Sequence, residues 1–447
     1  MSGPPRFRRL GLAHTLVAGY AVAVALGSVL LWLPIASEPG VDIDFGSAMF
    51  TATSAVTVTG LTVVDTASSF STFGEVVIAL LIQVGGLGIA TGGSLLALVV
   101  FRRLSLRHRM IARAESGVLA LGDVRRVVRA IALFSFACEA LVAALLTSRF
   151  AGTTDEPLVT SAWSGLFHAV SAFNNAGFSI YADSLARFQT DWLVVLPIAA
   201  ALVVGGIGIP VVLDLWRAPL DVHRWSLHTR LTVAVTAVLL VAGVGIITAV
   251  EWGNPASLGV EDISGKLAAG LLAGATPRTA GFAGFDYALA ETATIQLTIM
   301  LMFIGGGAAS TAGGVKVTTL GTGAAILRTE LRGHRDVHVL GRRLRPAVQR
   351  QALAILFTGA LFVAGGTMLL ALLTEADLTD VVFEVVSALG TVGLTRGLTP
   401  ELDLPGRLVV MVLMLAGRVG PLTLAAAVLF RQPVARYRLA TATPIIG

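Results

Sequence analysis

The sequence Thr57-Val58-Thr59-Gly60-Leu61 follows a short segment with a helical pattern, and a motif of the same kind returns three more times. The other copies are Asn174-Asn175-Ala176-Gly177-Phe178, Arg278-Thr279-Ala280-Gly281-Phe282 and Gly390-Thr391-Val392-Gly393-Leu394. In each copy a glycine precedes a large apolar residue, and successive glycines are 117, 104 and 112 residues apart. A motif that recurs at a nearly constant period indicates an internal repeat.

The chain around these motifs is rich in apolar residues and poor in charge. Of its 447 residues, 55% are hydrophobic and 13% are charged, whereas soluble domains carry about 25% charged residues. Apolar runs of the roughly 20 residues needed to cross a bilayer occur from end to end. The first of them is too long for a signal peptide and no cleavage site follows it, so we expect it to be retained. The sequence therefore predicts an integral membrane protein.

Eight long apolar runs are candidate spanning helices, and a shorter helical segment separates the two members of each successive pair. The long runs lie near residues 12–34, 73–100, 126–148, 190–216, 230–250, 290–327, 349–373 and 405–430. The short segments are 44–55, 161–172, 262–274 and 379–388. They are too short to span the membrane and are expected to be re-entrant. The predicted fold is all-α, with eight transmembrane helices and four re-entrant pore helices around a central pore.

A second landmark supports the repeat, because glycines recur in the long run after each motif. Gly86, Gly206, Gly306 and Gly417 follow their motif glycines by 26, 29, 25 and 24 residues. Each unit then reads as a first membrane helix (M1), a re-entrant P-loop and a second membrane helix (M2), and the four units run parallel. The predicted repeats are residues 1–113, 114–224, 225–335 and 336–447.

Charges alternate between successive loops. Arginines gather in 6–9, 102–129, 217–230, 328–350 and 431–438, and acidic residues gather in 38–44, 155–156, 251–262 and 375–380. Cytoplasmic loops carry the excess of Lys and Arg, so both termini are expected in the cytoplasm and the short segments on the outer side. The net charge of +5 then reflects membrane topology and does not indicate nucleic-acid binding. The single cysteine, Cys138, excludes an internal disulfide.

The four glycine motifs predict a cation pathway lined by backbone carbonyls. Non-helical chain at membrane depth is tolerated where it lines a watery cavity, and carbonyls can replace the hydration shell of a monovalent cation. Each short helix would also aim its partly negative C-terminal end at the axis. The predicted K⁺-binding residues are Val58, Thr59, Gly60, Asn175, Ala176, Gly177, Thr279, Ala280, Gly281, Thr391, Val392 and Gly393. The four motifs contain no Asp or Glu, so selectivity would come from carbonyls.

The third M2 run contains a feature that predicts a gate. Five glycines between residues 305 and 314 should break this helix, since each costs about 1 kcal/mol in a helix interior. The matching run of the fourth repeat carries Arg418, and a mid-membrane arginine is costly unless it faces a pore or protein. The predicted gating residues are Gly305, Gly306, Gly307, Ser310, Thr311, Gly313, Gly314, Lys316 and Arg418. A purely structural role for Arg418 is the alternative.

These motifs resemble the superfamily of potassium transporters that includes the Trk and Ktr membrane subunits and the plant HKT proteins. The four glycine motifs resemble its filter loops, Ser310-Thr311-Ala312-Gly313-Gly314 with Lys316 its intramembrane gating loop, and Arg418 its pore arginine. The KtrB group of membrane subunits fits best, because one spanning run precedes the first short segment and Trk-type subunits usually have an extra helix pair. Gly60 is similar to the potassium-selective members, since sodium-preferring plant relatives have serine there.

The resemblance implies potassium uptake across the bacterial cell membrane, by a protein that is not an enzyme. It also implies a homodimer with one pore in each protomer, and a cytoplasmic ring of nucleotide-binding regulatory subunits. Nucleotide is expected only on that partner, no cofactor is bound covalently, and an activating Na⁺ is left open. The arginine-rich segments 102–113 and 328–345 are either docking surfaces for the ring or topology determinants alone.

Other functions have weaker support. A Trk-type or sodium-permeable cation symporter of the same superfamily remains an alternative. A secondary transporter with alternating access would have inverted repeats and charged midplane residues, and a membrane-embedded hydrolase would need a catalytic cluster that the sequence does not offer. Three polar residues in apolar segments, Glu139, His168 and Glu384, are expected to have structural roles.

Overall fold

The computed structural model describes residues 12–102, 124–154, 157–219 and 221–420. In the first half of the chain the helices are α1 (Leu12–Trp32), α2 (Phe45–Thr57), α3 (Thr66–Ser69), α4 (Thr72–Arg102), α6 (Val124–Thr153), α7 (Leu158–Phe173), α8 (Trp192–Ile207), α9 (Ile209–Arg217) and α10 (Leu227–Glu251). In the second half they are α11 (Ile263–Ala275), α12 (Thr292–Phe303), α13 (Val317–Leu331), α14 (Pro346–Ala371), α15 (Leu378–Gly390), α16 (Leu398–Glu401) and α17 (Leu404–Val419). A hairpin of β1 (His338–Val339) and β2 (Arg342–Arg343) is the only sheet among the described residues.

The predicted mostly helical membrane fold is confirmed at the level of its class. By length and composition, α10, α14 and residues 128–153 of α6 could each cross a membrane, and the bent pair α8–α9 could be a fourth span. Shorter apolar helices occupy parts of other predicted spans. The last predicted span, 405–430, begins as α17, but its residues 421–430 lie outside the described part of the chain. The count of eight spans therefore stays a prediction.

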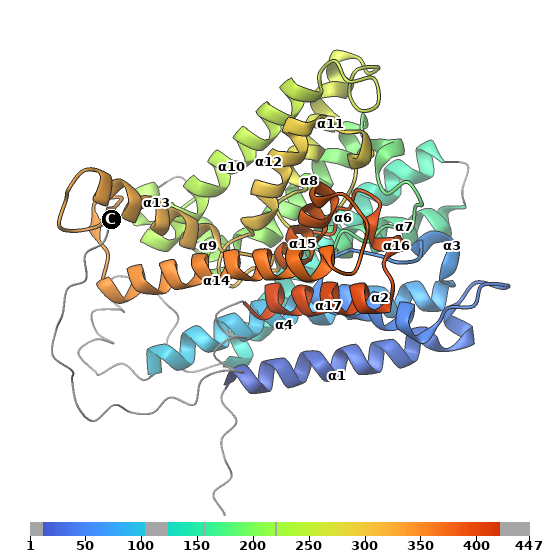
Figure 1. Cartoon of the computed structure of the whole chain (residues 1–447), viewed down its shortest axis with the longest axis horizontal. Helices are drawn as coiled ribbons and strands as arrows, with labels where there is room; N and C mark the ends of the chain where they lie inside the picture. Colours follow the sequence, from blue (N-terminus) through green and yellow to red (C-terminus); the bar gives the residue numbers. More distant parts are fainter. Residues whose placement is uncertain (1–11, 103–123, 155–156, 220, 421–447) are drawn as a thin grey trace, which may run out of the picture.

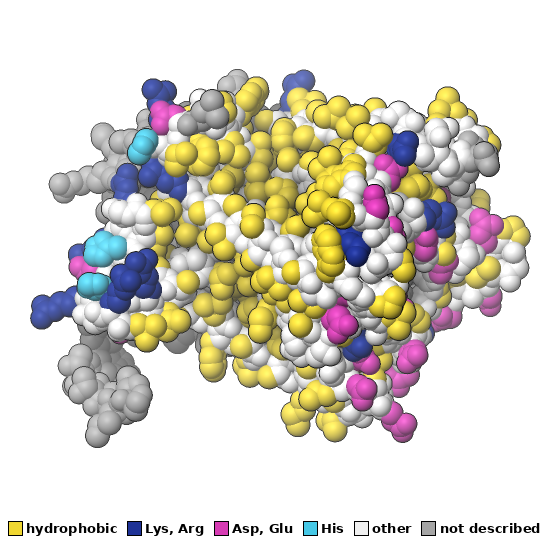
Figure 2. Space-filling view, turned by 90° about the horizontal axis from the view of Figure 1, so that it is seen from above, with side chains coloured by type: hydrophobic (Ala, Val, Ile, Leu, Met, Phe, Trp, Pro, Cys, Tyr) yellow, Lys and Arg dark blue, Asp and Glu magenta, His cyan; other side chains and the backbone are white. Residues whose placement is uncertain are grey.

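The surface of the molecule is divided along its long axis (Figure 2). Hydrophobic side chains cover the middle, the acidic side chains in view gather toward one end, and arginines with histidines gather at the opposite end. The exposed apolar residues include Phe357 (76% exposed) and Leu361 (62% exposed) on α14. An apolar belt between two polar ends of opposite charge is the surface expected of a protein embedded in a bilayer.

The short helices α2, α7, α11 and α15 lie where the sequence places its short segments, and each packs against the long helix before it (Figure 1). The pairs are α1 with α2, α6 with α7, α10 with α11 and α14 with α15. Each short helix also contacts a helix of the quarter before it, with the first quarter following the last: α7 contacts α4, α11 contacts α8, α15 contacts α12, and α2 contacts α17. The last contact closes the series, so the four quarters form a ring.

Local sequence explains where two of the short helices start. Asp44 caps α2 by accepting a hydrogen bond from the Ser47 amide (3.1 Å), and Asp262 caps α11 by accepting one from the Gly265 amide (2.7 Å). A side-chain oxygen at this position satisfies an amide that the helix cannot pair. The hydrogen bond from the Ser47 hydroxyl is the main cause that lowers the pKa of Asp44. Both caps lie in acidic segments of the sequence.

The break predicted in the third M2 run is confirmed, because α12 ends at Phe303 and α13 begins at Val317. Residues 304–316, which we call the glycine-rich loop, connect them. Its two ends are joined, since the Gly305 amide donates to the Val315 carbonyl (2.8 Å) and the Val315 amide to the Phe303 carbonyl (3.3 Å). The glycine-rich loop therefore leaves the end of α12 and returns to a point close to that end, where α13 begins.

The apolar run over residues 190–216, a candidate spanning helix from the sequence, forms two helices with a sharp bend between them. Helices α8 and α9 meet at an angle of 101°, and Gly208 between them has a φ of +92°. A Cβ atom on Gly208 would lie 2.5 Å from the carbonyl oxygen of Ala308, and the Ile209 amide donates to the Ala309 carbonyl (3.3 Å). The glycine-rich loop therefore packs against the bend, and glycine tolerates the positive φ there.

Candidate functional site

The four glycine motifs adopt one shared backbone conformation. In each, the glycine and the residue two positions before it have positive φ, whereas the residue between them does not. The positive angles are 56° and 94° at Val58 and Gly60, 60° and 69° at Asn175 and Gly177, 74° and 73° at Thr279 and Gly281, and 51° and 98° at Thr391 and Gly393. Positive φ is costly for the four residues that are not glycine. Its appearance at four equivalent positions therefore indicates a functional constraint.

The amide groups of these segments point back toward the short helices. The Thr59 amide donates to the Ser54 carbonyl (2.8 Å), the Ala176 amide to the Ser171 carbonyl (2.7 Å) and the Val392 amide to the Ser387 carbonyl (2.9 Å). In the third motif the Ala280 amide donates to the Thr276 carbonyl (3.0 Å). Two serine hydroxyls add to this pattern, because Ser54 accepts from the Gly60 amide (3.0 Å) and Ser387 from the Gly393 amide (3.1 Å).

The four segments meet in a closed ring, which we call the loop ring and define as residues 58–60, 175–177, 279–281 and 391–393. A Cβ atom on Gly60 would overlap the carbonyl oxygen of Ala176, and one on Gly177 would lie 2.7 Å from that of Ala280. A Cβ on Gly281 would overlap the carbonyl oxygen of Val392, and one on Gly393 would overlap that of Thr59. Each glycine thus touches the carbonyl that precedes the next glycine, and the fourth returns to the first.

The ring is electrostatically suited to a cation without any carboxylate in it. The short helices α2 and α15 end immediately before their ring segments, α7 ends one residue earlier and α11 three residues earlier. The C-terminal end of a helix carries about half a negative charge. With their amides bonded backwards, the segments leave carbonyl oxygens as the polar groups that can face the space they enclose. All twelve predicted K⁺-binding residues lie in this ring.

Glycines of the following helices allow close approach to the loop ring. A Cβ on Gly85 would overlap the carbonyl oxygen of Val56, one on Gly205 that of Phe173, and one on Gly417 that of Leu389. All three carbonyls lie four residues before a ring glycine. The equivalent glycines of the first two repeats are therefore Gly85 and Gly205. The sequence pattern matches Gly86 and Gly206 instead, which is wrong by one residue. Adjacent glycines in the sequence do not show which of them is the equivalent position.

The glycine-rich loop crosses directly against the loop ring. The Thr311 hydroxyl donates to the Phe173 carbonyl (3.2 Å) and lies 3.1 Å from Asn175 Oδ1. A Cβ on Gly313 would overlap Thr391 Oγ1 on the opposite side of the ring. The Gly307 amide donates to the Gly206 carbonyl (2.7 Å). The loop therefore reaches the second and fourth ring segments at once.

Two cations hold the glycine-rich loop. Arg418, 4% exposed on α17, donates to the Thr311 carbonyl and to the Gly85 carbonyl (2.9 Å). Lys316 Nζ donates to the carbonyls of Ala312 (2.6 Å) and Gly313 (3.2 Å). Neither forms an ion pair in the part of the chain that the structure describes. Ser310, which donates to the Gly307 carbonyl (2.7 Å), stabilises the loop internally.

A buried polar cluster supports the second ring segment from behind. Glu139, 2% exposed on α6, accepts hydrogen bonds from Gln83 Nε2 (3.0 Å) and Asn174 Nδ2 (3.1 Å). Asn174 also donates to Gln83 Oε1 (2.9 Å) and directly precedes the ring residue Asn175. The sequence indicates a hydrogen bond from Glu139 to a neighbouring helix. The sequence does not identify the partners of Glu139, because Gln83 lies in the first quarter of the chain and Asn174 lies after the next helix, α7.

We expect Glu139→Ala to lower the thermal stability of the protein. The change would leave the Gln83 amide without an acceptor, whereas Asn174 would keep its bonds to Gln83 and the Val170 carbonyl. A buried donor without a partner costs about 1–3 kcal/mol. The midpoint of heat-induced loss of the monodisperse chromatography peak measures this effect. Glu139→Gln, which keeps one acceptor oxygen, should retain part of the stability, and the exposed Glu401→Ala should change little. Equal midpoints for Glu139→Ala and Glu401→Ala would contradict the proposed support.

Two other buried polar residues contact the chain that follows a ring segment. Glu384 on α15 is fully buried and accepts hydrogen bonds from the hydroxyls of Thr395 (2.8 Å) and Thr399 (2.5 Å), which follow the fourth ring segment. His168 on α7 lies with its ring stacked on Tyr181 (5.0 Å between centroids) and with Nε2 2.9 Å from Ser179 Oγ. Both contacts agree with the structural roles that the sequence indicates.

The ring and its crossing loop belong to a mostly helical membrane protein in which each quarter of the chain contributes one ring segment. The sequence pattern of the TrkH family, described as a cation transport protein, matches residues 20–437. The chain belongs to this family. It is similar to Ktr system potassium uptake protein B of Bacillus subtilis, with 38% identity over 92% of this chain and 91% of the relative.

Other relatives extend the comparison. Ktr system potassium uptake protein B of Vibrio alginolyticus is 37% identical over 89% of this chain and 87% of its own. Potassium/sodium uptake protein NtpJ of Enterococcus hirae is 34% identical over 98% of both chains. The crystal structure of the potassium transporter TrkH from Vibrio parahaemolyticus matches the fold with a TM-score of 0.74 at 18% identity, covering 95% of this chain and 87% of that chain. The predicted resemblance to the KtrB group is confirmed, and these relatives are named as uptake proteins or transporters, not enzymes.

Proposed function

We propose that this protein takes up potassium across the bacterial cell membrane through the axis of the loop ring. The observation that carries the proposal is the closed series of contacts in which each ring glycine meets the carbonyl of the next segment. Four such segments can surround one dehydrated cation with carbonyl oxygens. The relatives named as potassium uptake proteins support the choice of ion. The four quarters are then M1–P-loop–M2 repeats, eight spans in all.

In this proposal the glycine-rich loop and Arg418 form the gate. The loop lies against the ring, and the guanidinium that holds it adds a positive charge near the ion path. A cation leaving the ring would meet both. Movement of the loop away from the ring, with Arg418 released from the Thr311 carbonyl, would open the path.

The proposed topology places the arginine-rich end of the molecule and both termini in the cytoplasm. Residues 6–9, 103–113 and 431–438 of the predicted basic segments lie outside the described part of the chain. We further propose a homodimer and a cytoplasmic nucleotide-binding regulatory ring, with residues 328–345 as one docking surface. Potassium in the ring is the only bound ion in this mechanism, and activation by Na⁺ is tested below.

Uptake of rubidium-86 into proteoliposomes that contain the purified chain tests the proposal. Excess K⁺ should compete with the tracer, and excess Na⁺ should compete at least about tenfold more weakly, a difference of about 1.4 kcal/mol. Uptake with and without low Na⁺ tests activation. Equal competition by both ions would favour the second candidate, a sodium-permeable transporter, for which the similarity to a potassium/sodium uptake protein is the specific support.

We expect Thr311→Val to increase uptake of the tracer severalfold. The valine keeps the side-chain shape but cannot donate to the Phe173 carbonyl or to Asn175 Oδ1, so the glycine-rich loop loses its hydroxyl contact with the second ring segment. One such hydrogen bond contributes about 0.5–1.5 kcal/mol. Thr311→Ser keeps the hydroxyl and should behave as the unmodified protein. If the valine and serine variants transport equally, this hydrogen bond does not hold the gate.

A further inference from the structure

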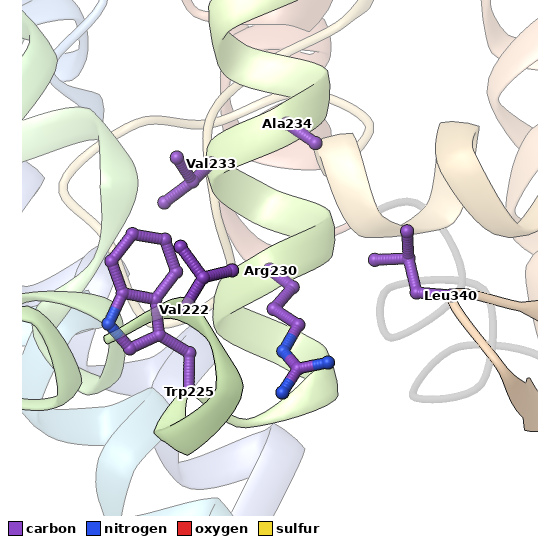
Figure 3. Close-up of a pocket in the computed structure, with 6 residues that line it drawn as sticks. All are labelled: Val222, Trp225, Arg230, Val233, Ala234 and Leu340. Carbon is purple, nitrogen blue, oxygen red and sulfur yellow. The ribbon is translucent and has the colours of Figure 1, made fainter. Parts of the chain in front are cut away.

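A cavity of about 430 Å³ lies beside the first turns of α10, and Figure 3 shows the residues that line it. The first two turns of α10, the segment around η3 (Val222–Arg224) and the tip of the β1–β2 hairpin enclose it. The residues that line it are Val222, Trp225, Arg230, Val233, Ala234 and Leu340. Five of these six side chains are apolar or aromatic, and Arg230 is the only charged one.

Arg230 enters this cavity with part of its guanidinium unsatisfied. Its NH2 group donates to the His223 carbonyl (2.5 Å), whereas its buried Nε has no hydrogen-bond partner. The indole N–H of Trp225 is already bonded to the Ala218 carbonyl (2.7 Å), so the indole offers the cavity only its hydrocarbon surface. The cavity thus combines one arginine side chain with apolar walls.

The carboxylates nearest in sequence are bound elsewhere. Asp221 pairs with Arg224 (3.0 Å), and Asp214 accepts from the Thr229 hydroxyl (2.6 Å). Among the ion pairs of the described residues, none includes Arg230. An uncompensated arginine donor favours an anionic oxygen as its ligand, because such charge-assisted hydrogen bonds are the strong ones.

In the proposed topology the cavity lies at the level where lipid headgroups meet the hydrocarbon. The apolar span of α10 starts at Leu227, so Arg230 is one turn inside it and Val233 and Ala234 are deeper. Trp216 at the end of α9 is 83% exposed, as expected of a tryptophan at the membrane interface. A ligand that follows α10 inward from Arg230 therefore passes from headgroup depth to acyl-chain depth.

We propose that this cavity binds an anionic phospholipid of the surrounding leaflet. The phosphate accepts hydrogen bonds from Arg230, and an acyl chain lies along Trp225, Val233 and Ala234. Basic pockets between membrane helices on the cytoplasmic side suit anionic headgroups, and the apolar walls favour a lipid over free phosphate. A bound lipid would also touch Leu340, and so connect α10 with the hairpin that follows α13.

Native mass spectrometry of the full chain in detergent tests the site, with phosphatidylglycerol and phosphatidylcholine of equal chain length as probes. We expect phosphatidylglycerol to bind about tenfold more tightly than phosphatidylcholine, a difference of about 1.4 kcal/mol. Arg230→Gln should remove this preference, and Arg230→Lys should keep part of it. Arg224→Gln is the matched control, because Arg224 precedes the same helix but does not line the cavity.

A second measurement locates the lipid. Brominated phosphatidylglycerol in vesicles should quench tryptophan fluorescence more than brominated phosphatidylcholine, and the difference should disappear in Trp225→Phe. This arm needs no change at Arg230, so it holds even where Arg230→Gln does not fold. An unchanged lipid preference in folded Arg230→Gln, or a quenching difference that persists in Trp225→Phe, would overturn the proposal. Displacement of the lipid by millimolar inorganic phosphate would do so too, because it would assign the site to a soluble anion.

Discussion

Replacement of Gly60 by serine is expected to remove most of the discrimination between K⁺ and Na⁺. Gly60 has a φ of +94°, and any Cβ on it would overlap the Ala176 carbonyl oxygen of the next ring segment. The side chain must displace that carbonyl or its own backbone, and either movement changes the oxygen cage. A loss of about 1.4 kcal/mol in differential binding lowers selectivity about tenfold. Competition of K⁺ and Na⁺ against rubidium-86 uptake measures it.

Gly40→Ser is the matched control for this change. Gly40 also has positive φ, at +88°, but a Cβ on it would meet nothing within 4 Å. It therefore carries the same backbone penalty without the contact inside the ring. If both serine variants reduce selectivity equally, general backbone strain explains the loss. If neither does, the carbonyls of the loop ring do not set selectivity, and a coupled transporter becomes the better explanation.

The helical fold and the ring residues could be predicted from sequence because both depend on local patterns. Apolar length predicts the long helices, and the short segments correspond to α2, α7, α11 and α15. The repeated glycine identifies where the backbone must turn, since positive φ at Gly60 or Gly393 is a local property of the chain. The break between Phe303 and Val317 follows in the same way from the density of glycine.

Contacts between distant parts of the chain could not be predicted in this way. The 101° bend lies at Gly208, where the chain contacts Ala308 and Ala309, a hundred residues later in the sequence. Pro210, two residues after Gly208, was the available signal in the sequence, since proline removes a helical hydrogen bond. The contact of Thr311 with Asn175 is likewise a consequence of how the quarters close, which no local pattern contains.

Arg418→Gln is expected to raise the rate of potassium uptake about tenfold. The arginine is buried and donates to the Thr311 carbonyl of the glycine-rich loop. In the proposed mechanism its charge repels a cation that leaves the ring. Glutamine can still donate one hydrogen bond to that carbonyl but carries no charge. A barrier lower by about 1.4 kcal/mol corresponds to a tenfold faster rate. Initial rates of rubidium-86 uptake at saturating substrate measure this change.

Arg407→Gln, on the same helix, is the control that distinguishes loss of the positive charge at the gate from loss of a positive charge elsewhere on α17. Arg407 donates to the Leu402 carbonyl (2.8 Å) and to Ser47 Oγ (3.1 Å), at the opposite end of α17 from Arg418. Its loss should leave the rate close to that of the unmodified protein. If folded Arg418→Gln transports more slowly or at the same rate, the guanidinium holds the loop in a required position and is not a barrier. A faster rate with unchanged competition by Na⁺ would show that rate and selectivity change independently. The gate would then lie in Arg418 and the glycine-rich loop, and the selectivity in the loop ring.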